Sequence, residues 1–413
     1  MGLKRSALFW ALVLASLIAI AGVLWISLRK PQIEAPPPTF RLVPTSFAKL
    51  PGWAAGDPRL ALDAFRRSCA EIEKRPATQP MGWAGYAGTV SAWLPACKVV
   101  PLRAVSAADA RAFFERWFAP VSVDRPAHFT GYYEPQLSGS RLPTPHYRVP
   151  IYGRPDDLIS VDLGAFRPSL EGEHIWGRVE GTKLVPYAAR AAIDAHGLAS
   201  APVLLYTDDP VSAFFLQIQG SGLVKLNTGE TLRLSYAAKN GRPYTPVGRV
   251  LIAKGALERK NVSMQSIRAW LAAHPEEAQR VMESDESYVF FELTPVEDPA
   301  LGSPGTEGIP ISPQASLAVD PRFHAFGTPV YVTTTVPDSD PAKPDHGFQR
   351  LLIAQDTGGA IKGPARGDIF FGAGPAAEAI AGRLNAHGQL FVLIPKAAAA
   401  ALGSARDFSD APL

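Results

Sequence analysis

The sequence predicts a mainly β protein whose short strands close into a barrel, with helices at the periphery. Proline accounts for 39 of the 413 residues, against a usual share of about 5%. Because proline ends helices and is excluded from central strands, this count favours short elements joined by shaped loops. From residue 126 to about 260, runs of β-branched and aromatic residues alternate with turn residues. That alternation is typical of a barrel or closed sheet.

Helices are predicted before this β-rich region. In "GDPRLALDAFRRSCAEIEKRP", Asp57 can cap a helix and Pro58 fits its first position. The apolar residues of that helix recur on one face: Leu60, Phe65, Cys69 and Ile72. A second helix in "SAADARAFFERWFAP" opens on Ser106 and Asp109, a pair like a capping box, and stops at Pro120. Its rings are expected in the core rather than in a ligand cage: Phe113, Phe114, Trp117 and Phe118.

The β-rich region contains a hairpin, and further elements follow it. "VKLNTGETLRLSY" places turn residues between two alternating runs, the pattern of a hairpin. Two helices are predicted next, in "SMQSIRAWLAAH" and, after Pro275, in "EEAQRVMES". Strands then return, in "YVFFELT", "TPVYVTTTV", "RLLIAQD" and "DIFFG", before a last helix at Pro375. The tail from Ala397 has low complexity.

The composition and net charge limit the classes of partner that are expected. A hydrophobic content of 47% provides for a packed core. The net charge is only +3, and no Lys/Arg-rich block stands out, so nucleic acid is not the expected partner. A mild positive balance suits a polyanionic partner without requiring one.

The N-terminus predicts a membrane anchor. Residues 6–28 form an uncharged apolar run flanked by basic residues, and a spanning helix needs roughly 20 residues. A cleaved signal peptide, the alternative, has a shorter apolar region and a small-residue cleavage site that does not follow here. A Pro-rich spacer comes next. The body is therefore expected outside the cytoplasm, which favours a disulfide between Cys69 and Cys97 over two buried free thiols.

The stretch "AQDTGGAIKGPARGDIFFG", residues 354–372, holds two carboxylates, Asp356 and Asp368. "DTG" is typical of an aspartic protease, but that chemistry needs a second acid from a similar motif, and no second D-[ST]-G occurs. "GGAIKG" lacks the order of glycines, lysine and hydroxyl residue that a phosphate loop requires.

Acid catalysis on a sugar is the third interpretation. Cleaving a glycosidic bond requires a carboxylic acid that protonates the leaving oxygen. Asp368 is followed by Ile369, Phe370 and Phe371, and an apolar site or a neighbouring carboxylate such as Asp356 would keep it protonated. In the alternative, either acid only accepts backbone N–H groups in a turn.

Several blocks, in order, resemble one family. "AVDPRFHAFGTPVYV", "AQDTGGAIKG" and "GDIFFG" resemble the three-aspartate module of cell-wall-active proteins, with Asp320, Asp356 and Asp368. Upstream, "FTGYYEP", "LLYTDDPVSAFFLQIQGSG", "LSYAAKNGRPYTPVGRVLI", "MQSIRAW" and "SYVFF" resemble the membrane-bound lytic murein transglycosylase A family. The resemblance runs from about residue 45 to 396.

The resemblance implies cleavage of peptidoglycan between N-acetylmuramic acid and N-acetylglucosamine without water, leaving a 1,6-anhydromuramyl end. It implies that Asp368 acts first as acid and then as base, that Asp356 is an essential supporting acid, and that no metal or other cofactor takes part. Asp320, before Pro321, is expected to form a turn. The substrate-binding candidates are Thr130, Gly131, Tyr132, Gln219, Gly220 and Ser221. Core packing for Tyr132 and a simple turn for residues 219–222 are the alternatives.

The fold that the resemblance implies is a double-psi β-barrel with a second, smaller inserted β-barrel and peripheral helices. The segments expected are an anchor over 1–30, a linker over 31–46, the double-psi barrel over 47–135 and 285–396 with the three-aspartate module at 315–372, the insert over 136–284, and a tail over 397–413.

The expected partners are peptidoglycan glycan strands, and the membrane through the N-terminal helix at its periplasmic face. Recruitment of other cell-wall enzymes is a further hypothesis that no motif supports. The rival function is a non-lytic, expansin-like binder of wall polysaccharide.

Overall fold

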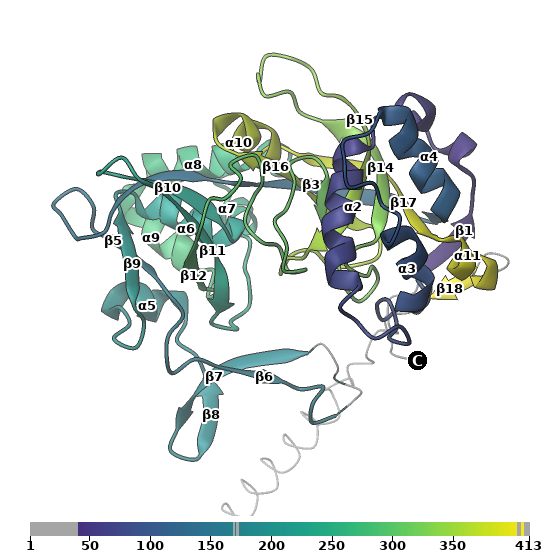
Figure 1. Ribbon diagram of the computed structural model, residues 1–413. Helices are drawn as coiled ribbons and strands as arrows, with labels where there is room; N and C mark the ends of the chain where they lie inside the picture. The colour runs from purple at the N-terminus through teal and green to yellow at the C-terminus, as the bar shows by residue number, and fades with distance from the viewer. Residues whose placement is uncertain (1–39, 168–169, 171–172, 403–405, 409–413) are drawn as a thin grey trace, which may run out of the picture. The chain divides into compact units, whose positions relative to one another are not determined.

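The computed structural model describes residues 40–167, 170, 173–402 and 406–408. Within them the chain forms three β-sheets with helices around them (Figure 1). The mainly β class expected from the sequence is confirmed.

Strands of the first sheet come from both ends of the described chain: β1 (Phe40–Pro44), β2 (Phe118–Val123), β3 (Ala127–Glu134), β13 (Ser316–Ala318), β14 (Pro329–Val336), β15 (His346–Asp356), β16 (Arg366–Ala373), β17 (Asn385–Pro395) and β18 (Arg406–Phe408). The second sheet comes from the middle: β4 (Gln136–Ser140), β5 (Val149–Tyr152), β9 (Val203–Thr207), β10 (Gly222–Leu226), β11 (Thr231–Lys239) and β12 (Val289–Thr294). The third sheet is small: β6 (Ile159–Asp162), β7 (His174–Glu180) and β8 (Lys183–Pro186).

The α-helices of the described chain are α2 (Arg59–Ile72), α3 (Val90–Cys97), α4 (Ala107–Trp117), α5 (Arg190–His196), α6 (Pro210–Gln219), α7 (Val247–Ala253), α8 (Met264–Ala273), α9 (Pro275–Glu283), α10 (Pro375–Ala381) and α11 (Lys396–Leu402). Short 3-10 helices are η1 (Phe47–Lys49), η2 (Trp53–Ala55) and η4 (Arg259–Asn261).

The first sheet closes on itself. Its strands run in the order β14-β15-β13-β16-β3-β17, and β17 pairs back with β14. Two pairs in this ring are parallel, β13 with β15 and β16 with β3, and the others are antiparallel. Strands β2, β1 and β18 extend the sheet beyond β17. This ring, built from N- and C-terminal segments, agrees with the double-psi barrel expected.

The second sheet is the smaller barrel. Its order is β12-β11-β10-β4-β9-β5, and a bridge between Gly153 and Phe291 brings its two end strands together. The predicted hairpin is confirmed as β10 and β11, which pair antiparallel. Leu205, Val224, Leu234 and Phe291 are among the buried side chains that fill this barrel.

The predicted helices near the N-terminus form, with two corrections. Helix α2 takes Pro58 rather than Asp57 as its N-cap, and Leu60 is 50% exposed while Leu62 is buried. The predicted apolar face is otherwise confirmed, because Phe65, Cys69 and Ile72 are buried, with Leu62 in the place predicted for Leu60. The cap of α4 is as predicted, since Ser106 accepts a hydrogen bond from the Asp109 N–H.

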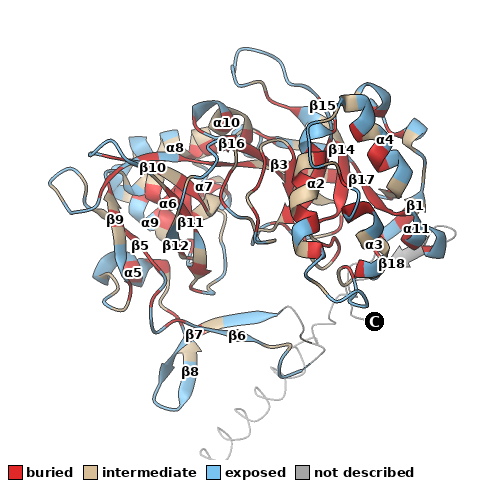
Figure 2. Cartoon of the chain, viewed as in Figure 1, coloured by how far each residue is buried: buried red, intermediate tan, exposed pale blue. Residues whose placement is uncertain are grey.

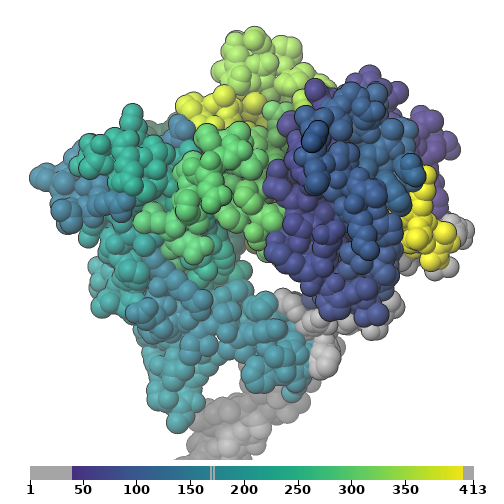
Figure 3. Space-filling view, in the orientation of Figure 1, coloured from purple at the N-terminus to yellow at the C-terminus, as the bar shows by residue number. Residues whose placement is uncertain are grey.

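The predicted rings of α4, and Phe118 at the start of β2, pack mostly in the core. Phe114 and Phe118 are fully buried and Phe113 nearly so, all three around Phe65, while Trp117 is half-buried. Figure 2 shows the buried residues concentrated in the strands of the first barrel, whereas β6–β8 are largely exposed. The two ends of the described chain also meet. Strand β1 pairs with β18, and in Figure 3 the yellow residues near 400 lie against residues coloured purple and blue.

A buried ion pair joins strand β3 to the second barrel. Glu134 lies 3.3 Å from Arg233 of β11, and both side chains are almost fully buried. The Ser303 N–H donates to Glu134, and Arg233 donates to the Leu301 carbonyl. Removing one partner of such a pair leaves an uncompensated buried charge, so this contact fixes how β3 leaves the first barrel.

The expectation of a transmembrane anchor is corrected. In the chain from residue 40 onward that the structure describes, no helix is long and apolar enough to cross a membrane. The predicted anchor over residues 1–30 lies outside the described residues.

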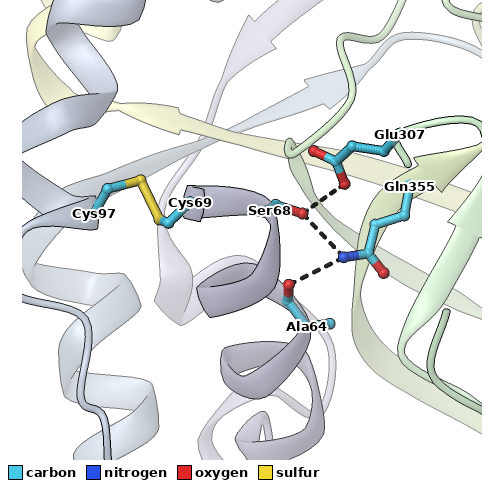
Figure 4. Close-up of a disulfide and its surroundings, with 6 residues drawn as sticks. All are labelled: Ala64, Ser68, Cys69, Cys97, Glu307 and Gln355. Carbon is cyan, nitrogen blue, oxygen red and sulfur yellow. Dashed lines mark hydrogen bonds between the residues drawn. A yellow bond between two sulfur atoms is a disulfide. The ribbon is translucent and has the colours of Figure 1, made fainter. Parts of the chain in front are cut away.

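Cys69 of α2 and Cys97 of α3 form a disulfide, with their Cα atoms 5.2 Å apart (Figure 4). Both residues are buried. The bond joins two helices through cysteines that are 28 positions apart in sequence, and it lies beside Ser68, which contacts Glu307 and Gln355.

Replacing both cysteines with serine is expected to lower the free energy of unfolding by about 2–4 kcal/mol, because the open chain gains conformational entropy when unfolded. Urea unfolding of oxidised protein measures this loss. A reducing agent should shift the midpoint of the native protein and leave that of the variant unchanged; equal midpoints for the native protein and the variant without reductant would contradict the prediction.

Candidate functional site

The register of the first barrel places both predicted acids beside the same residue. Ala318 of β13 pairs with Asp356 of β15 on one side and with Asp368 of β16 on the other. Asp368 in turn pairs with Thr130 of β3. Because neighbouring strands lie about 4.8 Å apart, the two acids are roughly 10 Å apart at their Cα atoms. The methyl group of Ala318 is the only side chain between them in this row.

Asp368 has one engaged and one free carboxylate oxygen. Thr130 donates its hydroxyl to Oδ1 in a short hydrogen bond. Arg366 Nη2 in turn donates to the Thr130 hydroxyl, at 2.5 Å. Within the described residues, Oδ2 accepts no hydrogen bond, and the side chain is partly exposed. That oxygen is the one able to carry a proton toward a ligand.

Asp356 is held much more firmly. Its Oδ1 accepts from the Thr306 N–H at 3.0 Å, the Thr306 hydroxyl at 2.8 Å and the Thr357 N–H at 2.9 Å. Its Oδ2 accepts from the Tyr132 hydroxyl at 3.0 Å. Four donors on one carboxylate favour its charged form.

The surroundings of the two acids affect their pKa values differently. Burial raises the pKa of Asp368, and the charge of Asp356 raises it further, against the lowering effects of Arg366 and Thr130. Burial also raises the pKa of Asp356, but the donors at Thr306, Thr357 and Tyr132 oppose that shift. Because Asp356 has more donors, we expect it to keep the charge and Asp368 to keep the proton.

Asp320 holds the loop between the two acids. It is fully buried, accepts from Arg322 at 2.8 Å, and accepts from the Gly363 N–H at 2.7 Å. Burial alone would raise the pKa of Asp320, but these hydrogen bonds outweigh it and lower the pKa. His324 binds the Pro364 carbonyl through Nε2 and the Tyr86 hydroxyl through Nδ1. The sequence-based expectation for Asp320, a turn former rather than a catalyst, agrees with this geometry.

A polar cluster behind Asp356 fixes the loop that carries Thr306. The Glu307 N–H donates to the Gln355 carbonyl at 3.0 Å, and Glu307 accepts from Ser68 at 2.7 Å (Figure 4). Gln355 donates to Ser68 and to the Ala64 carbonyl. Burial raises the pKa of Glu307 to about 8, so its side chain is largely neutral at pH 7.

The candidate binding residues divide between the two faces of β3. Thr130 and Tyr132 reach the acids directly. Gly131 points to the opposite face, where a Cβ would lie 2.8 Å from the Ala381 Cα. Gln219 accepts from the Tyr133 N–H at 3.0 Å and lines a cavity of about 380 Å³ together with Gly131.

Gly220 and Ser221 lie further from the acids. Gly220 ends helix α6 with φ 82°, a left-handed conformation that favours glycine. Ser221 is buried near Glu134, whose pKa its hydroxyl lowers. For these two residues the geometry indicates a structural part.

Sequence reasoning missed Thr306, Ala318 and Arg366. Thr306 lies 50 residues from Asp356, in a loop without a motif. Ala318 is an ordinary small residue until its pairing is known. Arg366 lies two positions before Asp368. A cation so close in sequence to a candidate acid was a local signal, which the other two residues lack. Among the described residues, no group of three or more His, Cys, Asp or Glu side chains is placed to hold a metal.

Comparisons with known proteins agree with this architecture. A family model described as the MltA specific insert domain matches residues 128–292, and one described as the 3D domain matches residues 315–394. The structure of a membrane-bound lytic murein transglycosylase from Agrobacterium tumefaciens is 32% identical, with a TM-score of 0.76 over 88% of this chain and 99% of its own. The chain belongs to the membrane-bound lytic murein transglycosylase A family.

Two further relatives add detail. The family member from Vibrio cholerae is 31% identical over 272 residues, and this match spans 64% of each chain. The structure of Escherichia coli MltA with bound chitohexaose is 25% identical, with a TM-score of 0.62, over 85% of this chain and 94% of its own. The insert boundaries at 136 and 284 lie inside the family match at 128–292 and stay a prediction.

Glu307 predicts a pH-dependent stability. A carboxyl whose pKa rises from 4.5 to about 8 on folding stabilises the protein fully below pH 4.5, and this stabilisation is lost as the pH rises through the folded value. Glu307→Gln keeps an acceptor for Ser68 but does not titrate, so the decline in the free energy of unfolding between pH 4.5 and 8 should be flatter in this variant. By pH 8 the variant should retain roughly 3–5 kcal/mol of stability that the native protein has lost.

Urea unfolding across that pH range measures the effect. Glu276→Gln, at an exposed site on α9, is the matched control and should retain the decline seen in the native protein. An equally steep decline in Glu307→Gln would show that Glu307 is ionised in the folded protein.

Proposed function

We propose that this protein is a lytic transglycosylase of peptidoglycan. It would cleave the β-1,4 bond between N-acetylmuramic acid and N-acetylglucosamine and leave a 1,6-anhydromuramyl end. The observation that carries the proposal is the pair of carboxylates on either side of Ala318, one held by four donors and the other with a free oxygen.

The proposed reaction uses Asp368 twice. Its proton passes to the glycosidic oxygen as the bond from that oxygen to C1 of the muramyl residue breaks. The resulting carboxylate then takes the proton of the 6-hydroxyl of the same sugar, whose oxygen bonds to C1. The proton returns to Asp368, no water is consumed, and the acid is ready for another cycle.

Asp356 acts in this proposal as a fixed negative charge. It raises the pKa of Asp368, which keeps the acid protonated, and its charge favours a positively charged, oxocarbenium-like transition state. Through Thr306 and Tyr132 it also fixes the walls beside Ala318.

The substrate side of the proposal rests on the residues around β3. Thr130 and Tyr132 contact the acids, and Gln219 and Gly131 line the cavity on the opposite face. The bound chitohexaose in the E. coli relative supports an oligosaccharide as the ligand class. The proposal includes a division into two domains, with an insert over residues 136–284.

A non-lytic binder of wall polysaccharide is the rival. It would bind the same strands, but binding alone does not require an acid that has a raised pKa and one free oxygen. Digestion of purified sacculi separates the two functions. The transglycosylase releases fragments about one water lighter than reducing ends, whereas the rival releases none; reducing ends alone would contradict our proposal.

Asp368→Asn should lower the rate of fragment release by at least about 100-fold, because the general acid and base is lost. Binding to sacculi should change little, since the amide keeps the shape of the side chain. Asp356→Asn should retain measurable activity with a lower rate. Mass spectrometry of released muropeptides measures both, and undiminished release by Asp368→Asn would mean that another group supplies the proton.

The pH profile tests the electrostatics of Asp368. Cleavage should decline as the pH rises through its raised pKa, because the acid must start protonated. Arg366 lowers that pKa, so Arg366→Gln should shift the alkaline limb of kcat/KM to higher pH. Arg366→Lys keeps the charge and is the control, expected near the native limb. A limb that stays in place in Arg366→Gln would exclude Asp368 as the group that titrates.

A further inference from the structure

A cavity of about 380 Å³ lies on the face of β3 opposite the two acids. Side chains alternate along a strand, so Thr130 and Tyr132 face the acids while Gly131 and Tyr133 line the cavity. Helices α6, α7 and α8 supply most of its other walls. The volume is in the range of small-ligand sites.

The cavity walls are held in place by contacts between distant segments. The Met264 N–H donates to the Gly382 carbonyl at 3.0 Å. Gln265 donates to the Glu378 carbonyl at 3.0 Å, and Gln219 binds the Tyr133 N–H. The cavity is therefore a built feature of the fold rather than a gap between loose segments.

Two arginines line the cavity beside its apolar floor. The floor includes Phe215, Ile218 and Met264. Arg249 and Arg259 line the cavity and are exposed, and in the described part of the chain neither side chain has a hydrogen bond or ion pair. The acid next to Arg259 in sequence does not neutralise it, because Glu258 lies 3.1 Å from Lys260.

Tyr244 connects this cavity to the reacting acid. It lines the cavity, is 37% exposed, and lies close enough to both sides to respond to their charges. Burial raises the pKa of Tyr244 to about 12, with further increases from Asp285 and Asp368 and an opposing decrease from Arg249. The cavity also lies close to Asp368 along the chain, because Gly131 lines the cavity and the preceding residue, Thr130, donates its hydroxyl to Asp368.

We propose that this cavity binds the lactyl group and first peptide residues carried by the N-acetylmuramic acid next to the cleaved bond, with Arg249 and Arg259 binding the carboxylates of the peptide. This inference rests on the proposed function. In a peptidoglycan strand the sugars are neutral, and the carboxylates belong to the lactyl-linked peptides. Guanidinium groups bind carboxylates through paired, charge-assisted hydrogen bonds. The methyl groups of lactate and alanine match the apolar floor.

The arrangement makes the muramyl residue, rather than N-acetylglucosamine, the sugar selected at the cleavage position. Only the muramyl residue carries an anionic substituent that reaches the arginines. Peptide-bearing strands should therefore bind more tightly than strands stripped of their peptides, while the chemistry at Asp368 is the same for both.

The test compares two substrates from one preparation of peptidoglycan: glycan strands with their peptides, and the same strands after an amidase has removed the peptides, which leaves only the lactyl carboxylate on each muramyl residue. We expect the native protein to have a KM roughly 10-fold lower for the peptide-bearing strands. In the double variant Arg249→Gln/Arg259→Gln that preference should disappear, with kcat/KM on stripped strands unchanged. Arg280→Gln, an exposed arginine on α9 outside the cavity, is the matched control and should keep the preference.

Binding by the Asp368→Asn protein separates this inference from the proposed function. If the native protein releases no anhydro fragments but Asp368→Asn still prefers peptide-bearing strands, the proposed function fails and the cavity assignment stands. If both strand types bind Asp368→Asn equally, or if the double variant retains the preference while folding normally, the cavity assignment is overturned whatever the outcome for cleavage.

Discussion

The position of the short strand β13 between β15 and β16 is the constraint on which the site depends. Ala318 pairs with Asp356 on one side and Asp368 on the other, so the two acids face the same surface with only a methyl group between them. A register shift of one residue in either pairing would turn an acid to the opposite face, because side chains alternate along a strand. In the β13–β15 pair the register shifts between Leu317 and Ala318, and this irregularity places Ala318 opposite Asp356. The geometry of the chemistry is therefore set by backbone hydrogen bonds as much as by side chains.

Holding two carboxylates at partly desolvated positions is unfavourable, and the surroundings offset that cost unequally. Asp356 has donors from Thr306, Thr357 and Tyr132, whereas Asp368 has Thr130 alone. This imbalance gives the two acids different proton affinities without any change of residue type. The network behind Asp356, with Ser68 and Gln355 as its centre, connects the site to helix α2 and its disulfide (Figure 4). Stability and site geometry are thus coupled through one buried cluster.

Strand β3 links the two barrels and serves both faces of the site. One face presents Thr130 and Tyr132 to the acids, and the other presents Gly131 and Tyr133 to the cavity with the two arginines. Its last residue, Glu134, is paired with Arg233 of the smaller barrel. Because this ion pair is buried, loss of either partner would leave an uncompensated charge where β3 leaves the first barrel. The insert therefore contributes walls to the site, and its contacts with β3 position those walls.

The sequence by itself determined the mainly β class, the hairpin at β10 and β11 and the family resemblance, and it predicted Asp356 and Asp368 as the acids. These follow from local patterns: alternation, turn residues and short motifs. It misplaced Leu60, because this residue lies five positions before Phe65 and so off the buried face, whereas Leu62, three positions before Phe65, lies on it. Thr306, Ala318, Arg249 and Arg259 carried no local signal. Their roles come from strand pairing and from helices that pack across long sequence separations. Only the tertiary structure decided which acid has a free oxygen, because its donors lie on other strands and loops.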